Sequence, residues 1–169
     1  MTVYNVSPIG FAGVSQVTAT LGTNDPEVGT RIRVGNSEYV HCYNAGASAI
    51  KVGWGGFLNS SNSGFSVTVS NAASQAGPLV GVCYHASIPA ANYGWLVVKG
   101  LSYVAADASE TSQGVSGGSA YITPGVDGGF VVAPASIATS PKYGLLISTM
   151  QTQGTTSPGL AWIYNTIFS

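Results

Sequence analysis

Charge is scarce in this sequence of 169 residues, in which Asp, Glu, Lys and Arg together make up 7%. In ordinary soluble domains these residues make up about a quarter of the chain. Five basic residues and a net charge of −1 leave no electrostatic footprint for nucleic acid, so we expect no nucleic-acid partner. A surface of small uncharged side chains has little repulsion between molecules, which favours association with neighbouring proteins.

Long apolar runs and cysteines are also few. No run reaches the roughly 20 residues that span a bilayer, so we expect no membrane partner. The N-terminal sequence MTVYNVSPIGFAG lacks the basic start and apolar core of a secretory signal, which predicts a protein made in the cytoplasm. Cys42 and Cys83 are too few for a disulfide scaffold. A single bridge between them is one alternative, and two buried free thiols are the favoured one.

The centre of the sequence predicts a buried β-hairpin. Residues 79–86 and 93–98 are apolar runs rich in Val and aromatic residues, separated by a short linker that contains Pro89 and Asn92. This linker is too short for a crossover helix, so the two runs should pair as antiparallel strands. A hairpin this apolar must bury both faces, which places it at the centre of a barrel or sandwich, or in a subunit interface.

The rest of the chain continues the β pattern, and no segment shows a sustained helical period. The alternation in residues 38–43 is typical of a half-buried strand, and residues 119–123 and 129–133 flank a turn as a second hairpin. We therefore expect an all-β fold, an antiparallel β-barrel or sandwich over residues 31–169, with residues 1–30 as an extended N-terminal arm or edge segment. The other expected strands are 14–21, 31–34, 47–52, 56–58, 65–69, 101–105, 143–149 and 160–168.

A serine-hydrolase motif is present in form, because residues 114–118 match G-x-S-x-G. His41, Asp107 and Ser116 even follow the chain order of a chymotrypsin-like triad. Asp107 and Ser116 are too close in sequence for that fold, and neither a histidine nor a helix follows Ser116 as an α/β-hydrolase requires. A hydrolase that uses Ser116 remains a minor alternative, and the protein is not expected to be an enzyme.

Metal and cofactor sites are not expected either. His41, Cys42, Cys83 and His85 are the residue types of a zinc site. Neighbouring strand residues point to opposite faces, so His41 and Cys42 cannot easily share a metal, whereas Cys83 and His85 would share a face. The carboxylates are scattered, and no phosphate-binding G-x-x-x-x-G-K loop is present.

Aromatic residues suggest a carbohydrate-binding face as a second alternative, because aromatic rings stack on sugars. The candidates are Trp54, Tyr93, Trp95 and Trp162. Trp95 and Trp162 lie in apolar strands and fit core or interface positions. Trp54, which lies among glycines, is the one to test.

Residues 36–105 resemble the small decoration or cement proteins of tailed-phage heads. The resemblance is carried by EYVHCYN at 38–44, IKVG at 50–53, GVCYHA at 81–86, IPA at 88–90 and YGWLVVKG at 93–100. It implies a non-enzymatic β-barrel or sandwich that binds the outside of a capsid shell, often as a trimer. The implied partner is the major capsid protein, and the implied location is the exterior of the virion. Similar low-charge β-proteins occur in tails and fibres, so that location stays an alternative.

Binding to a capsid should use apolar contacts and backbone pairing, because salt screens charge pairs. Arms and edge strands can add to a neighbour's sheet. Two segments fit this role, the N-terminal arm and the C-terminal strand at 160–168. The expected partner-binding residues in these segments are Tyr4, Ile9, Phe11, Trp162 and Phe168, and the sixth is Trp54, the aromatic residue among glycines.

Overall fold

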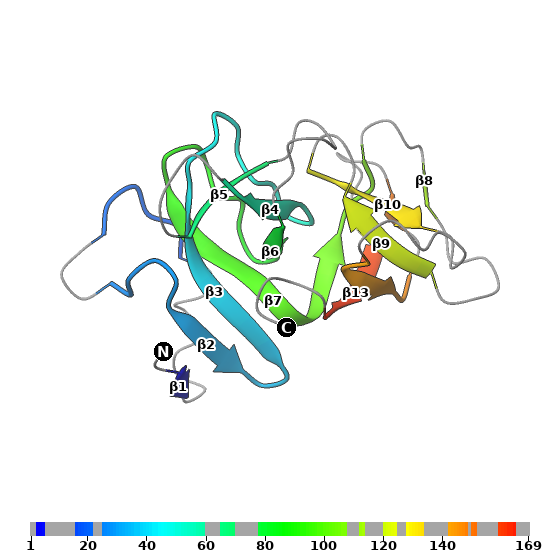
Figure 1. Cartoon of the computed structure of the whole chain (residues 1–169), viewed down its shortest axis with the longest axis horizontal. Coiled ribbons are helices and arrows are strands. Elements are labelled where there is room, and N and C mark those ends of the chain that lie inside the picture. Colours follow the sequence, from blue (N-terminus) through cyan, green and yellow to red (C-terminus); the bar gives the residue numbers. More distant parts are fainter. Residues whose placement is uncertain are drawn as a thin grey trace.

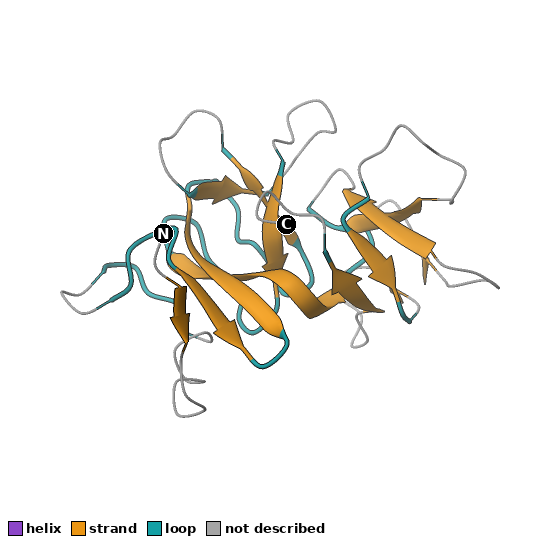
Figure 2. Cartoon of the chain, turned by 60° about the horizontal axis from the view of Figure 1, so that its bottom comes forward, coloured by secondary structure: helices purple, strands orange, loops and turns teal. Residues whose placement is uncertain are grey.

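The computed structural model of the chain describes residues 3–5, 16–21, 25–59, 65–69, 78–107, 112–113, 120–124, 128–133, 142–148, 150–151 and 159–164. Every regular element within these residues is a strand (Figure 2). Accordingly, this part of the chain contains no helix of the length and apolarity needed to cross a membrane. The strands are β1 (Val3–Asn5), β2 (Arg31–Val34), β3 (Ser37–Asn44), β4 (Gly55–Leu58), β5 (Ser66–Thr68), β6 (Leu79–Cys83), β7 (Tyr93–Val104), β8 (Ser112–Gln113), β9 (Ala120–Pro124), β10 (Phe130–Ala133), β11 (Gly144–Leu146), β12 (Met150–Gln151) and β13 (Gly159–Ile163).

Five strands close a β-barrel in the order β3-β5-β4-β6-β7, and the pairing of β3 with β7 completes the ring. β3 and β5 run parallel, whereas the other neighbours in the ring run antiparallel. The expectation of an all-β barrel is confirmed. The sequence did not indicate the parallel pair.

The predicted central hairpin is β6 and β7. They pair antiparallel, with Val82 opposite Val97 and Cys83 opposite Leu96, and all five residues of β6 are buried. Gly81 allows the close approach, because a Cβ there would lie 2.6 Å from the Val97 carbonyl oxygen. The predicted runs at 93–98 and 101–105 form one strand of 12 residues rather than two, which passes through Gly100 at φ 110°.

β7 connects the barrel to a second sheet (Figure 1). Its first part pairs with β3 and β6, and residues 100–104 pair with β13. The second sheet continues from β13 through β11 and β9 to β10, always antiparallel. Its last two strands are the second hairpin expected from the sequence. A separate two-stranded sheet joins β8 and β12.

Two apolar cores result from this arrangement. The first fills the barrel and includes Val40, Cys42, Ile50, Val67, Val80, Leu96 and Val98. The second lies between the barrel wall and the second sheet and includes Phe57, Leu79, Val82, Val104, Phe130, Leu146 and Ile163. Strands β6 and β7 contribute to both cores, which is why their sequences are almost continuously apolar.

The expectation that β3 is half-buried is wrong, because both of its faces are covered. Val40 and Cys42 are fully buried in the barrel, and His41 on the opposite face is only 2% exposed. β2 pairs with β3 edge to edge, and its Ile32 packs in one cluster with Tyr39 and Trp95 on this outer side of the barrel.

The N-terminal region lies along the same side of the barrel. β1 pairs parallel with β2 at the edge of the sheet, and Thr18 forms an isolated antiparallel bridge with Tyr93. In the described part of 14–21 this bridge takes the place of the predicted strand. Residues 47–52 are likewise not a strand, and Ile50 there forms one bridge with Ile88. The domain boundary at residue 30 remains a prediction.

Candidate functional site

The six predicted partner-binding residues lie in different environments. Trp162 is exposed on β13, and Tyr4 lies in the edge strand β1. Ile9, Phe11 and Phe168 fall outside the described residues.

Trp54 is buried, at 7% exposure, so the expectation of an exposed ring there is wrong. Two chain segments far apart in sequence enclose the indole. A Cβ at Gly128 would lie 2.8 Å from the Trp54 ring, and the neighbouring Gly55 amide donates to the Gly128 carbonyl oxygen at 2.8 Å. On another side, the Lys51 ammonium lies 4.9 Å from the ring centroid.

Large apolar side chains gather on the outer face of β7, β13 and β11. Of the five large hydrophobic side chains that the described residues leave exposed, four lie here: Leu101, Tyr103, Ile147 and Trp162. Leu145 and Leu160, which are half-buried, lie between them. We call these six residues the apolar face.

The strand register makes five residues of the apolar face contiguous, and a backbone hydrogen bond joins Ile147 to them. Trp162 lies opposite Leu101 on one side and opposite Leu145 on the other. In the next row, Tyr103 lies opposite Leu160, whose carbonyl oxygen accepts from the Ile147 amide at 2.7 Å. Directly opposed residues share one side of an antiparallel sheet and lie within side-chain contact. The two rows therefore form one surface.

Beneath the centre of the apolar face, two small residues lie on the inner side of β7 and β13. Ser102 and Ala161 are opposite one another, and both are fully buried. The Ser102 hydroxyl donates to the Tyr103 carbonyl oxygen at 3.1 Å, so its polar group is satisfied inside the protein. Here β7 alternates with large apolar residues outside and a small polar residue inside, the reverse of a solvent-facing sheet.

Aromatic rings extend the apolar face toward the barrel. Tyr84 stacks on Tyr103 with ring centroids 5.0 Å apart, and His85 meets Tyr84 edge-on at 4.5 Å. His85 also stacks on Tyr39 at 5.7 Å. We call Tyr39, His85, Tyr84 and Tyr103 the aromatic ladder. It gives the surface polar edges beside its apolar centre.

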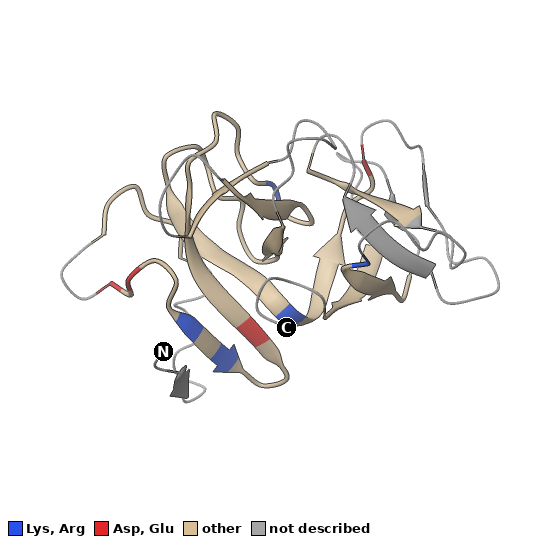
Figure 3. Cartoon of the chain, in the orientation of Figure 1, with Lys and Arg blue, Asp and Glu red and all other residues tan. Residues whose placement is uncertain are grey.

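Charge is sparse around this surface (Figure 3). Lys99 is exposed two residues before Leu101, on the same side of β7. The partly exposed ion pair between Arg31 and Glu38, 2.7 Å long, lies on the β2–β3 hairpin. A partner that covers the apolar face would therefore displace water from hydrocarbon and leave most charges in solvent.

The residues considered for zinc binding do not share one side of the barrel. Cys42 and Cys83 are buried free thiols in the barrel core, whereas His85 is exposed. The expectation that Cys83 and His85 share a face is wrong, because β6 ends at Cys83. No group of three or more His, Cys, Asp or Glu side chains suited to a metal occurs among the described residues.

The thiols are unsuited to nucleophilic chemistry at neutral pH. Burial raises the pKa of Cys83 to about 12 and also raises the pKa of Cys42. The Cys83 thiol donates to the Ala86 carbonyl oxygen at 3.0 Å. Both groups stay protonated, and a thiol is a weak nucleophile compared with a thiolate.

Of the hydrolase candidates, His41 and Asp107 are both buried, and Ser116 lies outside the described residues. Asp107 follows β7, and its amide donates to the Phe130 carbonyl oxygen at 2.9 Å in the second sheet. His41 packs on the other part of the fold, against Tyr93 and Trp95 of the barrel.

Among the residues of the apolar face, the sequence predicts Trp162 as a partner-binding residue. For Leu101 and Tyr103, the signal is the alternation Leu101-Ser102-Tyr103, which lies in the same strand, β7, as the apolar run at 93–98. That alternation predicts two faces of a strand, but it does not show which face lies inside.

No protein-family model and no curated protein matches the chain. Among solved structures, the chain is similar to the N base of the head fibre gp8.5 of bacteriophage phi29, with a TM-score of 0.46 and 14% identity. The similarity covers 75% of this chain and 94% of that chain. At this level, the similarity carries no argument about function.

Proposed function

We propose that this chain is a non-enzymatic structural protein of a tailed-phage virion. In this proposal it decorates the exterior of the capsid and stabilises it by binding the major capsid protein through the apolar face. It acts as a homo-oligomer, and a trimer is the favoured state. The observation that carries the proposal is the gathering of four exposed large apolar side chains on one sheet face.

Physical chemistry supports this use of the face. Monomeric soluble proteins rarely expose large contiguous apolar patches, and such patches mark protein–protein contacts or ligand-binding sites. Burying the face would stabilise a complex by about 25 cal/mol for each Å² of apolar surface removed from water. Contacts of this kind persist at high salt, which suits a protein that holds neighbouring capsid subunits together. The sequence resemblance of residues 36–105 to decoration proteins is consistent with this role.

The test is co-sedimentation of the purified protein with empty capsids of the virus that encodes it, at low and at molar salt. We expect saturable binding in a fixed ratio to the capsid protein, with little loss at molar salt. Binding that molar salt abolishes would contradict an apolar contact, and the absence of binding would contradict decoration of the capsid.

A matched pair of substitutions assigns the contact to the apolar face. Leu101 and Leu21 are both 38% exposed, but Leu21 lies outside the apolar face. Leu101→Ser should weaken capsid binding tenfold or more, whereas Leu21→Ser should leave it unchanged. Equal affinities for the two variants would exclude the face, and a loss with Leu21→Ser alone would move the contact to the N-terminal arm.

The aromatic ladder favours a carbohydrate-binding virion module as a second candidate function. Its exposed members, His85 and Tyr103, combine ring faces with polar edges, as sugar-binding residues do. Binding on a glycan array that Tyr103→Ala abolishes would support this function and direct attention to tails or fibres. If the wild-type protein binds no glycan on the array, the carbohydrate-binding function is excluded.

A further inference from the structure

Residues 16–21 and 25–30 lie across the outer face of β3 and β7, and we call them the covering segment. Four backbone hydrogen bonds attach it to the barrel. The Gly29 amide donates to the His41 carbonyl oxygen at 2.8 Å, and the His41 amide donates to the Thr30 carbonyl oxygen at 2.9 Å. Thr18 and Tyr93 exchange the other two bonds, at 3.2 and 2.8 Å. Each of these four bonds involves one of two barrel residues, His41 or Tyr93.

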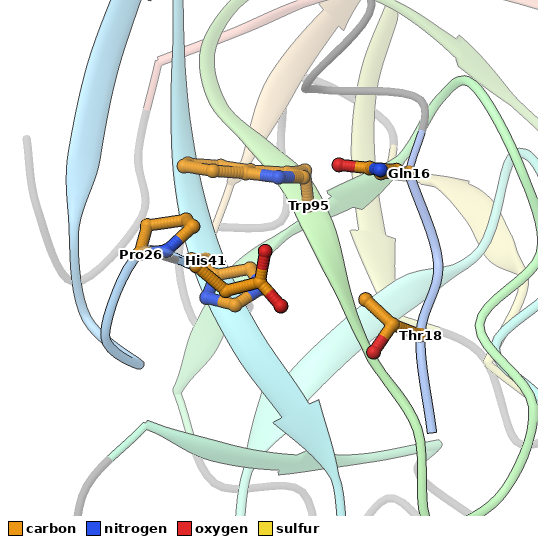
Figure 4. Close-up of a pocket in the computed structure, with 6 residues that line it drawn as sticks. Gln16, Thr18, Pro26, His41 and Trp95 are labelled. Atoms are coloured by element: carbon orange, nitrogen blue, oxygen red, sulfur yellow. The ribbon is translucent and has the colours of Figure 1, made fainter. Parts of the chain in front are cut away.

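The imidazole of His41 lies between this segment and the barrel wall. Its ring centroid is 4.9 Å from that of Trp95 and 6.1 Å from that of Tyr93, both on β7. A cavity of about 60 Å³ adjoins it, lined by Gln16, Thr18, Asp25, Pro26, His41 and Trp95 (Figure 4). The covering segment supplies four of these six residues, so the cavity exists only while the segment is in place.

The surroundings of the His41 imidazole favour its neutral form. Its Nδ1 is buried and has no hydrogen-bond partner among the described residues. A neutral ring can leave one nitrogen as an unused acceptor, but a protonated ring has an N–H at both nitrogens. Protonation here would therefore bury a positive charge, which disfavours the closed structure.

Other groups around the ring raise the pKa of His41, but their combined effect is smaller than that of burial. The charge of Asp25 and the backbone groups of Glu27 and Pro26 favour the protonated form, and all three belong to the covering segment. The β7 groups that face the ring, Trp95 and Tyr93, are aromatic. Desolvation is the largest effect, and it lowers the pKa of His41 below its usual value.

We propose that His41 is an acid-sensitive latch, which holds the covering segment on the barrel at neutral pH and releases it when the ring is protonated. The sign follows from linkage. In the open form the ring is in water with a pKa near 6.5, whereas the closed form holds the proton less tightly. The free energy that favours the closed form over the open form is therefore largest above about pH 6.5, and it decreases as the pH falls below that value.

Hydrogen–deuterium exchange at the attachment amides tests the latch. We would compare Thr18, Gly29, His41 and Tyr93 at pH 7.5 and 5.0, after correction for intrinsic exchange rates. We expect opening to increase at pH 5.0 by up to about 30-fold, the limit set by an open-form pKa near 6.5. Amides of the barrel core, such as Leu96, should keep their protection.

Two variants separate the latch from a general acid effect. His41→Gln cannot titrate, so its attachment amides should open to the same extent at both pH values, whatever their absolute protection. His85 is the other of the two histidines and lies on the aromatic ladder. His85→Gln should therefore respond to acid as the wild-type protein does.

Two results would overturn the proposal. One is the same acid response in His41→Gln as in the wild type. The other comes from exchange at the histidine ring carbon, which reports the pKa of His41 in the wild-type protein. A ring pKa at or above 6.5 would show that closing the segment does not oppose protonation.

Discussion

At Gly81 the barrel wall has no room for a side chain, because a Cβ would lie 2.6 Å from a backbone oxygen of β7. Gly81→Ala must separate two core strands, so we expect it to lower the free energy of unfolding by about 1–3 kcal/mol. Urea unfolding measures this change. Gly35 is the control, since its surroundings are open within 4 Å and Asn tolerates its positive φ of 59°. Equal stabilities of Gly81→Ala and Gly35→Asn would show that the strands can separate freely.

The two cysteines should be unreactive in the folded protein. Burial keeps both thiols protonated, with a pKa of about 12 for Cys83. A thiol reagent at pH 8 should therefore label neither residue until the protein is unfolded, and should then label both. Mass spectrometry of native and denatured samples measures the labelling. Rapid labelling of the native protein would contradict the closed barrel core around Cys42 and Cys83.

Whether a single side chain is buried or exposed is the feature that the sequence predicts least well. Trp54, among glycines, predicted an exposed ring, yet Gly128 packs against that ring from a segment more than 70 positions along the chain. Leu101 and Tyr103 have the apolar character of core residues, yet they face outward. Both outcomes depend on contacts between distant segments, which local patterns do not contain.

Along β7, the same residue type serves two purposes within a single element. Leu96 is fully buried in the barrel, whereas Leu101 is 38% exposed on the apolar face. We expect Leu96→Ala to lower the free energy of unfolding by about 2–5 kcal/mol, and Leu101→Ala by about 1 kcal/mol or less. Thermal unfolding followed by circular dichroism compares the two. Similar losses from both substitutions would mean that Leu101 is a core residue rather than part of a binding surface.

Most strands could be predicted from the sequence, but only some of their pairings could. Residues 31–34 form the expected strand, and both hairpins pair as predicted, because their strands are neighbours in sequence. The parallel pairing of β3 with β5 and the closure of β3 on β7 join distant segments and leave no local signal. Residues 47–52 have the composition of a strand, but they form a single bridge at Ile50.

For the whole molecule, stability should depend little on salt. Charged residues make up 7% of the chain, and the ion pair between Arg31 and Glu38 is partly exposed. Exposed pairs contribute about 0–1 kcal/mol, so we expect less than about 1 kcal/mol of change in unfolding free energy between 0.05 and 1 M NaCl. Urea titrations at the two salt concentrations measure it. A larger loss at high salt would indicate that charge contributes more to the fold than its scarcity suggests.

The position of β7 in both sheets also bears on how quickly the chain folds. In the barrel, β7 meets β3 at positions such as Cys42 and Gly94, which are 52 residues apart. Residues 100–104 of β7 can pair with β13 only after β13 has been synthesised, which happens much later because β13 lies near the end of the sequence. Domains dominated by such distant pairings fold over milliseconds to seconds rather than microseconds. Until β13 arrives, a nascent chain presents the unpaired edge of β7, with Leu101 and Tyr103 on it, to other chains and to chaperones.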